Sequence, residues 1–419
     1  MAKALTKAPY SPLPDPPKQA KRKKRPLLRA LVALVLAATL LLVLWAAVYK
    51  PLVEGPVFLS YRSLTVREGV FNYLYSFYRY RIPASVEFKE LGVRDTAAFW
   101  ASPYQGDVTQ GEHYGQVAVQ MIRQTLVAAA LFDRYSTLSA TEAEELKTLQ
   151  DEVLTADYKG GGSRDTFNGQ AEQYGFTYRD FIEGSTLLYK ATRAQRALYG
   201  TGGLLAPEED LERVLAEEYA CVLMIFVRTK DKFVFDSQGN YVIEDGQYKT
   251  EPLSEEEKAA KAAKLAAIAS ALADGTDSAE FATLWQTHNE DSSQKLSGTY
   301  FSLLSDYTAA YAAAFPPKEE NGTPIYAAAL SLEVGQTATV ESEYGTHVLF
   351  RMPVAKGAYD QKDLAEYFED FYEKASSLLY ADRLAEECDR IRTTAKGRRY
   401  IDSLDFASFP PNKTLFFLP

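Results

Sequence analysis

Histidine is scarce in this chain, and one of its three histidines stands where it could do chemistry. His347 lies in the stretch EYGTHVLFR (343–351), which predicts a turn followed by a short strand whose first buried position is the histidine. A buried imidazole can move a proton or anchor a polar network. It can equally be a structural residue whose nitrogens are satisfied inside the fold. Both interpretations stay open on the sequence alone.

Other kinds of reactive site lack the residues that they need. Cys221 and Cys388 lie far apart without a CxxC motif, which excludes a disulfide framework and a cysteine zinc site. They are expected as two buried thiols, with one long-range bridge as the alternative. His113 and His288 have no partner at metal-ligand spacing, and there is no Gly-rich phosphate loop or nucleophile–base motif. We therefore expect no metal site and no cofactor.

Charge and hydropathy divide the first 50 residues from the rest. Residues 1–29 carry +8 (nine Lys or Arg, one Asp), and since the whole chain carries −10, the remainder carries −18. The next 19 residues, Ala30–Val48, contain Thr39 as the sole polar side chain and would span about 28 Å as a helix, enough to cross a bilayer. A cleaved signal peptide is the alternative.

This asymmetry predicts a location and excludes one class of partner. Because a basic flank stays cytoplasmic, residues 1–29 are expected to form a cytoplasmic tail and residues 30–48 a transmembrane helix. The bulk of the chain would then lie outside the cell membrane, in a single-pass arrangement. A negative exterior disfavours nucleic acid as a partner.

Helical periodicity dominates residues 57–216 and predicts an all-helical unit. Thr65 and Glu68 have the spacing of a capping box and would start its first helix. The stretch His113–Ser136 is apolar around most of its circumference and predicts a central buried helix. Another helix is expected to begin at Ser139 or Thr141, because acidic residues follow in the first turn.

The pattern changes at residue 217, and a small domain is expected from there to 358. Tyr219–Thr229 is an apolar run of strand length. Ser254 and Glu257 start a helix with a capping box, a second helix follows, and a short helix at 324 precedes two closing strands. This order predicts an α+β fold class. A long helix over 359–395 and an irregular tail over 396–419 complete the chain.

Four stretches of this domain, in this order, resemble the parvulin-type prolyl isomerase domain. They are EFATLWQTHNED (280–291), SGTYFSL (297–303), PIYAAALSLEVGQ (324–336) and EYGTHVLFR (343–351). The helical unit, with LSATEAEE after its central helix, resembles the N-terminal chaperone region of SurA-like and PrsA-like extracytoplasmic foldases. The resemblance covers about residues 57–395. It implies a parvulin-like domain inserted into one chaperone core, with the helix at 359–395 packing back on the helical unit.

The resemblance also implies roles for individual residues. His347 and Asp291 would belong to a catalytic polar network beneath the peptide-binding cleft, and Met224 stands where the family has a second histidine. Asp291 could instead form a turn, and Met224 could be plain core. The glycine-rich loop of the family reads SGTYF here, without its aspartate. The substrate pocket for the proline ring would be lined by Tyr300, Leu303, Ile325 and Leu330.

A membrane-anchored peptidyl-prolyl cis–trans isomerase acting on secreted or envelope proteins is the function that the resemblance implies. Rotation about an X–Pro bond has a barrier of about 18–20 kcal/mol, which an apolar pocket and a tuned polar environment can lower. Because half of the polar network is absent, the alternative is a catalytically weak chaperone that holds unfolded secreted proteins. An envelope scaffold is a third interpretation. Unfolded or newly translocated polypeptides are the expected partners, and homodimer formation stays open.

Overall fold

The computed structural model describes residues 26–44, 55–155, 162–272, 276–291 and 293–412. They fall into two compact units, of which one ends at Val57 and the other begins at Phe58. In the first unit, α1 (Pro26–Leu44) includes most of the predicted transmembrane segment, and Trp45–Val48 lie outside the described residues. Among the described helices, none combines the length and hydropathy of a bilayer-crossing segment.

The second unit opens with strands where only helices were expected. β1 (Val57–Tyr61) and β2 (Leu64–Arg67) are neighbours in a small sheet, so Thr65 lies within a strand and the predicted capping box does not form. The first helix of this unit, α3, begins at Glu68 without a side-chain cap. The helices up to residue 218 are α3 (Glu68–Ala84), α4 (Val86–Glu90), α5 (Ala97–Ala101), α6 (Gln110–Tyr135), α7 (Ala140–Glu152), α8 (Arg164–Ala171), α9 (Tyr178–Ala191), α10 (Ala194–Tyr199) and α11 (Glu208–Glu218). A further pair of strands, β3 (Pro103–Gln105) and β4 (Val108–Thr109), precedes α6.

Local signals start the longer of these helices. Thr109 and Glu112 form a capping box at α6, which begins three residues before the predicted His113, and Ser139 and Glu142 form another at α7. Such caps contribute about 1 kcal/mol each, so the buried faces of the helices supply most of the stability. The core between α3, α6 and α9 is rich in aromatic rings and includes Phe71, Tyr73, Tyr75, Ile122, Leu126 and Phe181.

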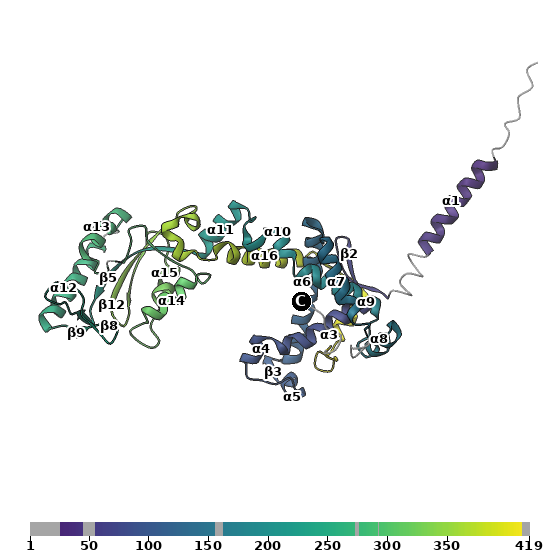
Figure 1. Cartoon of the computed structure of the whole chain (residues 1–419), viewed down its shortest axis with the longest axis horizontal. Helices are drawn as coiled ribbons and strands as arrows, with labels where there is room; N and C mark the ends of the chain where they lie inside the picture. The colour runs from purple at the N-terminus through teal and green to yellow at the C-terminus, as the bar shows by residue number, and fades with distance from the viewer. Residues whose placement is uncertain (1–25, 45–54, 156–161, 273–275, 292, 413–419) are drawn as a thin grey trace, which may run out of the picture. The chain divides into compact units, whose positions relative to one another are not determined.

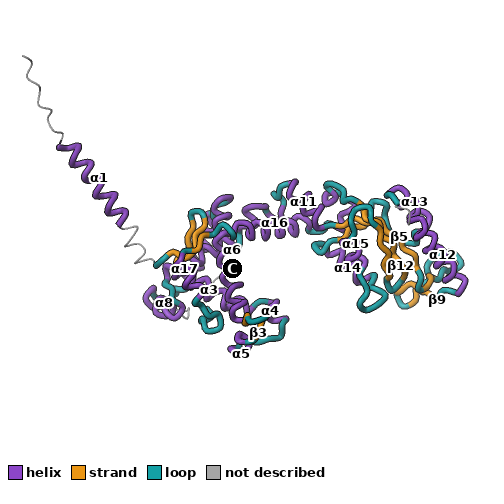
Figure 2. The backbone as a smooth tube through the Cα atoms, turned by 180° about the vertical axis from the view of Figure 1, so that it is seen from behind, coloured by secondary structure: helices purple, strands orange, loops and turns teal. Residues whose placement is uncertain are grey.

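The segment from 220 to 352 is built on one antiparallel sheet. Its strands run in the order β10 (Thr299–Phe301), β5 (Ala220–Arg228), β12 (Gly345–Met352) and β11 (Thr337–Glu341). Two helices, α12 (Glu255–Leu272) and α13 (Ser278–His288), cover one face, whereas α14 (Asp306–Ala314) and α15 (Ile325–Ser331) cover the other (Figures 1 and 2). Short strands between β5 and α12 form two small ladders: β6 (Asp231–Phe233) with β9 (Thr250–Pro252), and β7 (Ile243–Glu244) with β8 (Gln247–Tyr248). The prediction of an α+β fold is confirmed.

The C-terminal helix is shorter than predicted, and the chain after it is not irregular throughout. Two 3₁₀ segments, Ala358–Asp360 and Lys362–Tyr367, precede α16 (Phe371–Cys388). Asp370, at a φ of 58°, takes a left-handed conformation that an α-helix cannot contain, so the helix starts after it. Beyond α16, β13 (Arg392–Thr393) pairs with β1, and α17 (Ala395–Asp402) lies within the predicted tail.

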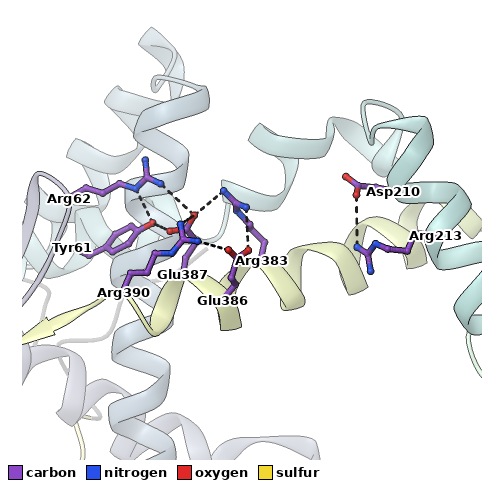
Figure 3. A network of polar contacts seen from close by, with 8 residues as sticks. All are labelled: Tyr61, Arg62, Asp210, Arg213, Arg383, Glu386, Glu387 and Arg390. Carbon is purple, nitrogen blue, oxygen red and sulfur yellow. Dashed lines mark hydrogen bonds and ion pairs between the residues drawn. The ribbon is translucent and has the colours of Figure 1, made fainter.

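The end of α16 makes a buried ionic contact with the start of this unit. The Glu387 side chain is fully buried and faces Arg62 together with Arg383 and Arg390 of its own segment, at N–O distances of 3.5, 2.8 and 3.1 Å (Figure 3). Tyr61 also donates a hydrogen bond to this carboxylate. α16 packs against α6, α10 and α11 as well. Residues beyond 370 therefore share a core with residues 58–218.

Candidate functional site

The pairing of β5 with β12 determines which side chains surround His347. His347 lies opposite Phe226, and Leu349 lies opposite Met224, so these four residues share the face that α14 and α15 cover. The turn before β12 needs its glycine, because a Cβ on Gly345 would lie 2.3 Å from the Val227 carbonyl oxygen. The turn and strand predicted from EYGTHVLFR are therefore present, and they bury the histidine.

His347 is held in place by a neighbouring hydroxyl. Its Nε2 lies 2.9 Å from Oγ of Ser342, which also lies 3.2 Å from the Gly345 carbonyl oxygen. Nδ1 is buried and has no hydrogen-bond partner among the described residues. If the Ser342 hydroxyl donates to the carbonyl oxygen, Nε2 carries the proton and Nδ1 is an unused acceptor. The imidazole is thus oriented through one nitrogen only.

The environment keeps this imidazole neutral. Only 1% of the His347 side chain is exposed, and its ring packs against Phe226 and Phe315 with centroid distances of 4.6 and 5.4 Å. Burial lowers the pKa of His347 to about 4, and the charge of Asp291 offsets only part of that shift. At neutral pH the site therefore offers an uncharged ring, which can orient or polarise a bound group but carries no positive charge.

Asp291 is a turn former that also acts on the site electrostatically. Its Oδ1 accepts hydrogen bonds from the backbone and hydroxyl of Ser293, at 2.9 and 2.6 Å, and its Oδ2 accepts one from Gln294 at 3.1 Å. No hydrogen bond joins it to His347 in the described part of the chain. The carboxylate still contributes to the electrostatic environment of His347 and of Tyr311. The two interpretations of Asp291 are therefore compatible.

Met224 lies below α14 rather than in a polar network. Its side chain is 1% exposed, and the Tyr311 hydroxyl approaches its sulfur at 3.6 Å. Burial raises the pKa of Tyr311 far above the ordinary tyrosine value, so this phenol stays protonated. A tyrosine from α14 thus occupies the space beside the position where the resemblance implies a histidine.

The four residues predicted to line a proline pocket do not lie together. Ile325 is buried in the same core as Met224, and Leu330 packs on that core half-buried. Tyr300 points to the opposite side of β10, because the neighbouring Phe301 takes the position facing α14, and side chains alternate along a strand. Leu303 is 76% exposed. The predicted substrate contacts thus separate into two on α15, where Ile325 is buried and Leu330 half-buried, and two that lie elsewhere.

The residues that sequence reasoning missed lie on α14 and directly after it, where Phe315 is the C-cap residue. Tyr307, Tyr311 and Phe315 follow one another at four-residue spacing, and their rings are in contact at centroid distances of 5.7 and 4.8 Å. This spacing places all three on one face of a helix, and it was the signal available in the sequence. Phe315 also lies against His347 and Phe226. The ring of Phe315, directly after α14, therefore covers the histidine.

Comparisons with known proteins add structural similarities of low strength. No protein-family model matches the chain, and no curated protein matches it. Among solved structures, PrsA from Bacillus subtilis is 16% identical, with 71% of this chain and 90% of that chain covered and a TM-score of 0.18. The peptidylprolyl isomerase PrsA from Bacillus cereus is 17% identical, with 71% of this chain and 93% of that chain covered and a TM-score of 0.22. The foldase PrsA from Lactococcus lactis is 13% identical, with 83% of this chain and 98% of that chain covered and a TM-score of 0.20. With TM-scores this low, the similarity assigns neither an activity nor a partner to this chain.

Proposed function

We propose that this protein is an extracytoplasmic foldase that holds unfolded polypeptides, and that its parvulin-like domain is a weak peptidyl-prolyl isomerase. The observation that carries this proposal is the cover formed by α14 and the residue that follows it, Phe315. Tyr311 and Phe315 pack directly on Met224 and His347, which are each 1% exposed. A proline ring cannot reach the histidine until these aromatic side chains move.

An efficient isomerase is the second candidate, and the state of His347 favours it. The imidazole is neutral, is oriented by Ser342, and has a buried Nδ1 without a partner among the described residues. A buried polar atom without a partner costs about 1–3 kcal/mol, a cost that a bound ligand could remove. This candidate requires α14 to move aside when a substrate binds.

The location is part of the same proposal. The 19 apolar residues of 30–48 follow a strongly basic segment, which supports an uncleaved anchor with residues 1–29 in the cytoplasm. Residues after the anchor would then meet newly translocated chains outside the membrane. Homodimer formation is compatible with this arrangement and is not required by it.

Two assays on the full-length chain separate the candidates. The first measures the refolding rate of a protein whose folding is limited by a proline isomerisation, and the second measures suppression of aggregation of an unfolded client. Strong suppression with little acceleration supports the chaperone with weak activity. Acceleration at catalytic amounts of protein supports the efficient isomerase, and the absence of both effects contradicts the proposal.

A further inference from the structure

A cavity of about 900 Å³ lies in the helical part, formed by elements outside the parvulin-like domain. The N-terminal half of α6, the short helix α5, the turn between β3 and β4 and the segment 401–407 surround it. Its volume is near the upper end of the range of about 300–1,000 Å³ that is usual for ligand sites. Its accessible apolar lining includes Val108, Val119, Ile401 and Leu404.

One wall of this cavity is braced by a buried guanidinium. Arg79 is 4% exposed, pairs with Asp95 at 2.8 Å and donates a hydrogen bond to the Phe406 carbonyl oxygen at 2.8 Å. Its guanidinium carbon lies 4.9 Å from the ring centroids of Trp100 and Phe406, and Trp100 donates a hydrogen bond to Asp95 at 2.7 Å. Both rings line the cavity. These contacts hold the wall in shape before any ligand arrives, which lowers the entropic cost of binding.

The rim of the cavity is acidic. Four carboxylates line it, from Asp107, Glu112, Asp402 and Asp405, against the single guanidinium of Arg123. Asp107 and Asp402 are exposed and form no ion pair with any described residue, whereas Arg123 donates a hydrogen bond to the Cys388 carbonyl oxygen. The described residues contain no cluster of three side chains that could hold a metal ion. The charge therefore suits a ligand with a cationic side chain.

Unused amides stand beside these carboxylates. Gln116 and Gln120 lie one turn apart on α6, line the cavity and are exposed, and neither side chain makes a hydrogen bond to another described residue. An amide side chain can pair with both the N–H and the C=O of an extended backbone. Two of them spaced by a helical turn could therefore bond to a peptide that runs along α6.

From this combination we propose that the cavity binds an extended segment of unfolded polypeptide carrying Lys or Arg beside an apolar side chain. The cationic group would lie among Asp107, Asp402 and Asp405, the apolar side chain against Val119 and Leu404, and the backbone along the glutamines. This inference rests on the proposed polypeptide binding and adds a site and a preference to it.

Fluorescence anisotropy of two labelled peptides tests this proposal on the full-length chain. The first is a decapeptide in which Lys and Leu residues alternate and are separated by Gln. The second has the same sequence with Glu in place of each Lys. The double variant Asp107→Asn with Asp402→Asn removes the two unpaired rim charges. Its matched control, Glu369→Gln with Asp382→Asn, removes two exposed charges outside the cavity. Because exposed ion pairs are individually weak and are screened by salt, loss of two of them should make the rim variant bind the Lys peptide about two- to thirtyfold more weakly at low salt.

The outcomes separate this site from the general function. Preferential binding of the Lys peptide, weakened in the rim variant alone, supports the proposal. If the rim variant and its matched control bind the Lys peptide with equal affinity while aggregation suppression persists, the site is overturned and the proposed function stands. Absence of both peptide binding and suppression overturns the two together. The tail KTLFFLP (413–419) has the same chemistry, so a chain ending at Asn412 that binds the peptide more than tenfold tighter would identify the tail as the occupant and overturn a client site.

Discussion

Glu387 of α16 accepts a hydrogen bond from the phenol of Tyr61 in β1, although 326 positions separate the two residues in sequence (Figure 3). The carboxylate is fully buried and is surrounded by Arg62, Arg383 and Arg390. Burial alone would raise the pKa of Glu387, but the Tyr61 hydrogen bond and the three guanidinium charges outweigh it and lower the pKa. The ionised form is therefore the one that stabilises this contact between the two ends of the unit.

Replacing Glu387 with Gln should lower the free energy of unfolding by about 1–3 kcal/mol, because the three arginines lose their common partner yet keep access to water. Glu386→Gln is the matched control, since its carboxylate pairs with Arg383 and Arg390 on the exposed side of the helix. The control should lower the free energy of unfolding by less than about 1 kcal/mol. Chemical denaturation at pH 7 measures the free energy of unfolding of both variants. Since the native pKa is lowered, the difference between wild type and Glu387→Gln should shrink as the pH falls below the ordinary glutamate pKa. Equal stability of the two variants would show that the buried contact contributes nothing.

Removing the aromatic cover should expose the histidine. We expect Phe315→Ala to increase the rate of proline-limited refolding, because the truncated side chain no longer packs on His347. Phe315 is half-buried, so a stability cost of about 1–3 kcal/mol accompanies the change. Phe235→Ala is the control, because Phe235 is a 53% exposed aromatic in the segment between β5 and α12. An unchanged or lower rate in a folded Phe315→Ala protein would argue against α14 as the cause of weak activity.

Restoring a second polar group beneath α14 should also raise activity. In Met224→His, the new imidazole would stand beside the Tyr311 hydroxyl, which now approaches the methionine sulfur. The volumes are similar, so packing should cost less than about 1.5 kcal/mol provided that the hydroxyl bonds to the ring. Met224→Leu gives the matched apolar replacement. We expect faster isomerisation in the histidine variant alone, measured on Xaa-Pro peptides, and unchanged aggregation suppression in both. Faster isomerisation in Met224→Leu as well would show that looser packing, and not the imidazole, is responsible.

His347 should make the fold sensitive to mild acid. Its native pKa of about 4 lies below the ordinary value near 6.5, so protons bind the unfolded chain first, and stability should fall as the pH drops from about 6.5 to about 4. The full effect is on the order of 2–3 kcal/mol for one buried imidazole. His347→Gln should remove this part of the pH dependence, whereas His288→Gln, on the last turn of α13, should keep it. Urea denaturation at pH 7, 6, 5 and 4 measures it, and parallel curves for wild type and His347→Gln would contradict the prediction.

The proposed anchor predicts an orientation. Protease added outside intact cells that express the full chain should digest residues beyond about Lys50 and leave a short N-terminal fragment, because the +8 charge precedes the apolar segment. A tag at residue 2 and a second at the C-terminus report the two ends. Protection of the C-terminal tag in intact cells, together with its digestion after lysis, would overturn the orientation.

Some of this architecture was determined by local sequence. Capping boxes specify where α7 and α12 begin, because Ser139 and Glu142, like Ser254 and Glu257, exchange hydrogen bonds over three residues. The apolar run Tyr219–Thr229 and the turn before His347 likewise predicted β5 and β12. The α+β class followed from this order of elements. In each case the residues whose interaction decides the local structure are neighbours in the sequence, so the sequence of that segment is enough to predict the element.

The tertiary structure decided the rest, because the deciding partner is distant in sequence. The Thr65–Glu68 spacing suits a capping box, yet strand formation beside β1, which itself pairs with β13 more than 300 residues away, places Thr65 in β2. Pairing of β10 with β5 directs Phe301 toward α14 and Tyr300 away from it, an alternation that depends on register and not on composition. The burial of His347 likewise required α14 to fold over it. The sequence thus placed an imidazole on a strand, and only long-range packing determined that it is neutral, covered and hydrogen-bonded to Ser342.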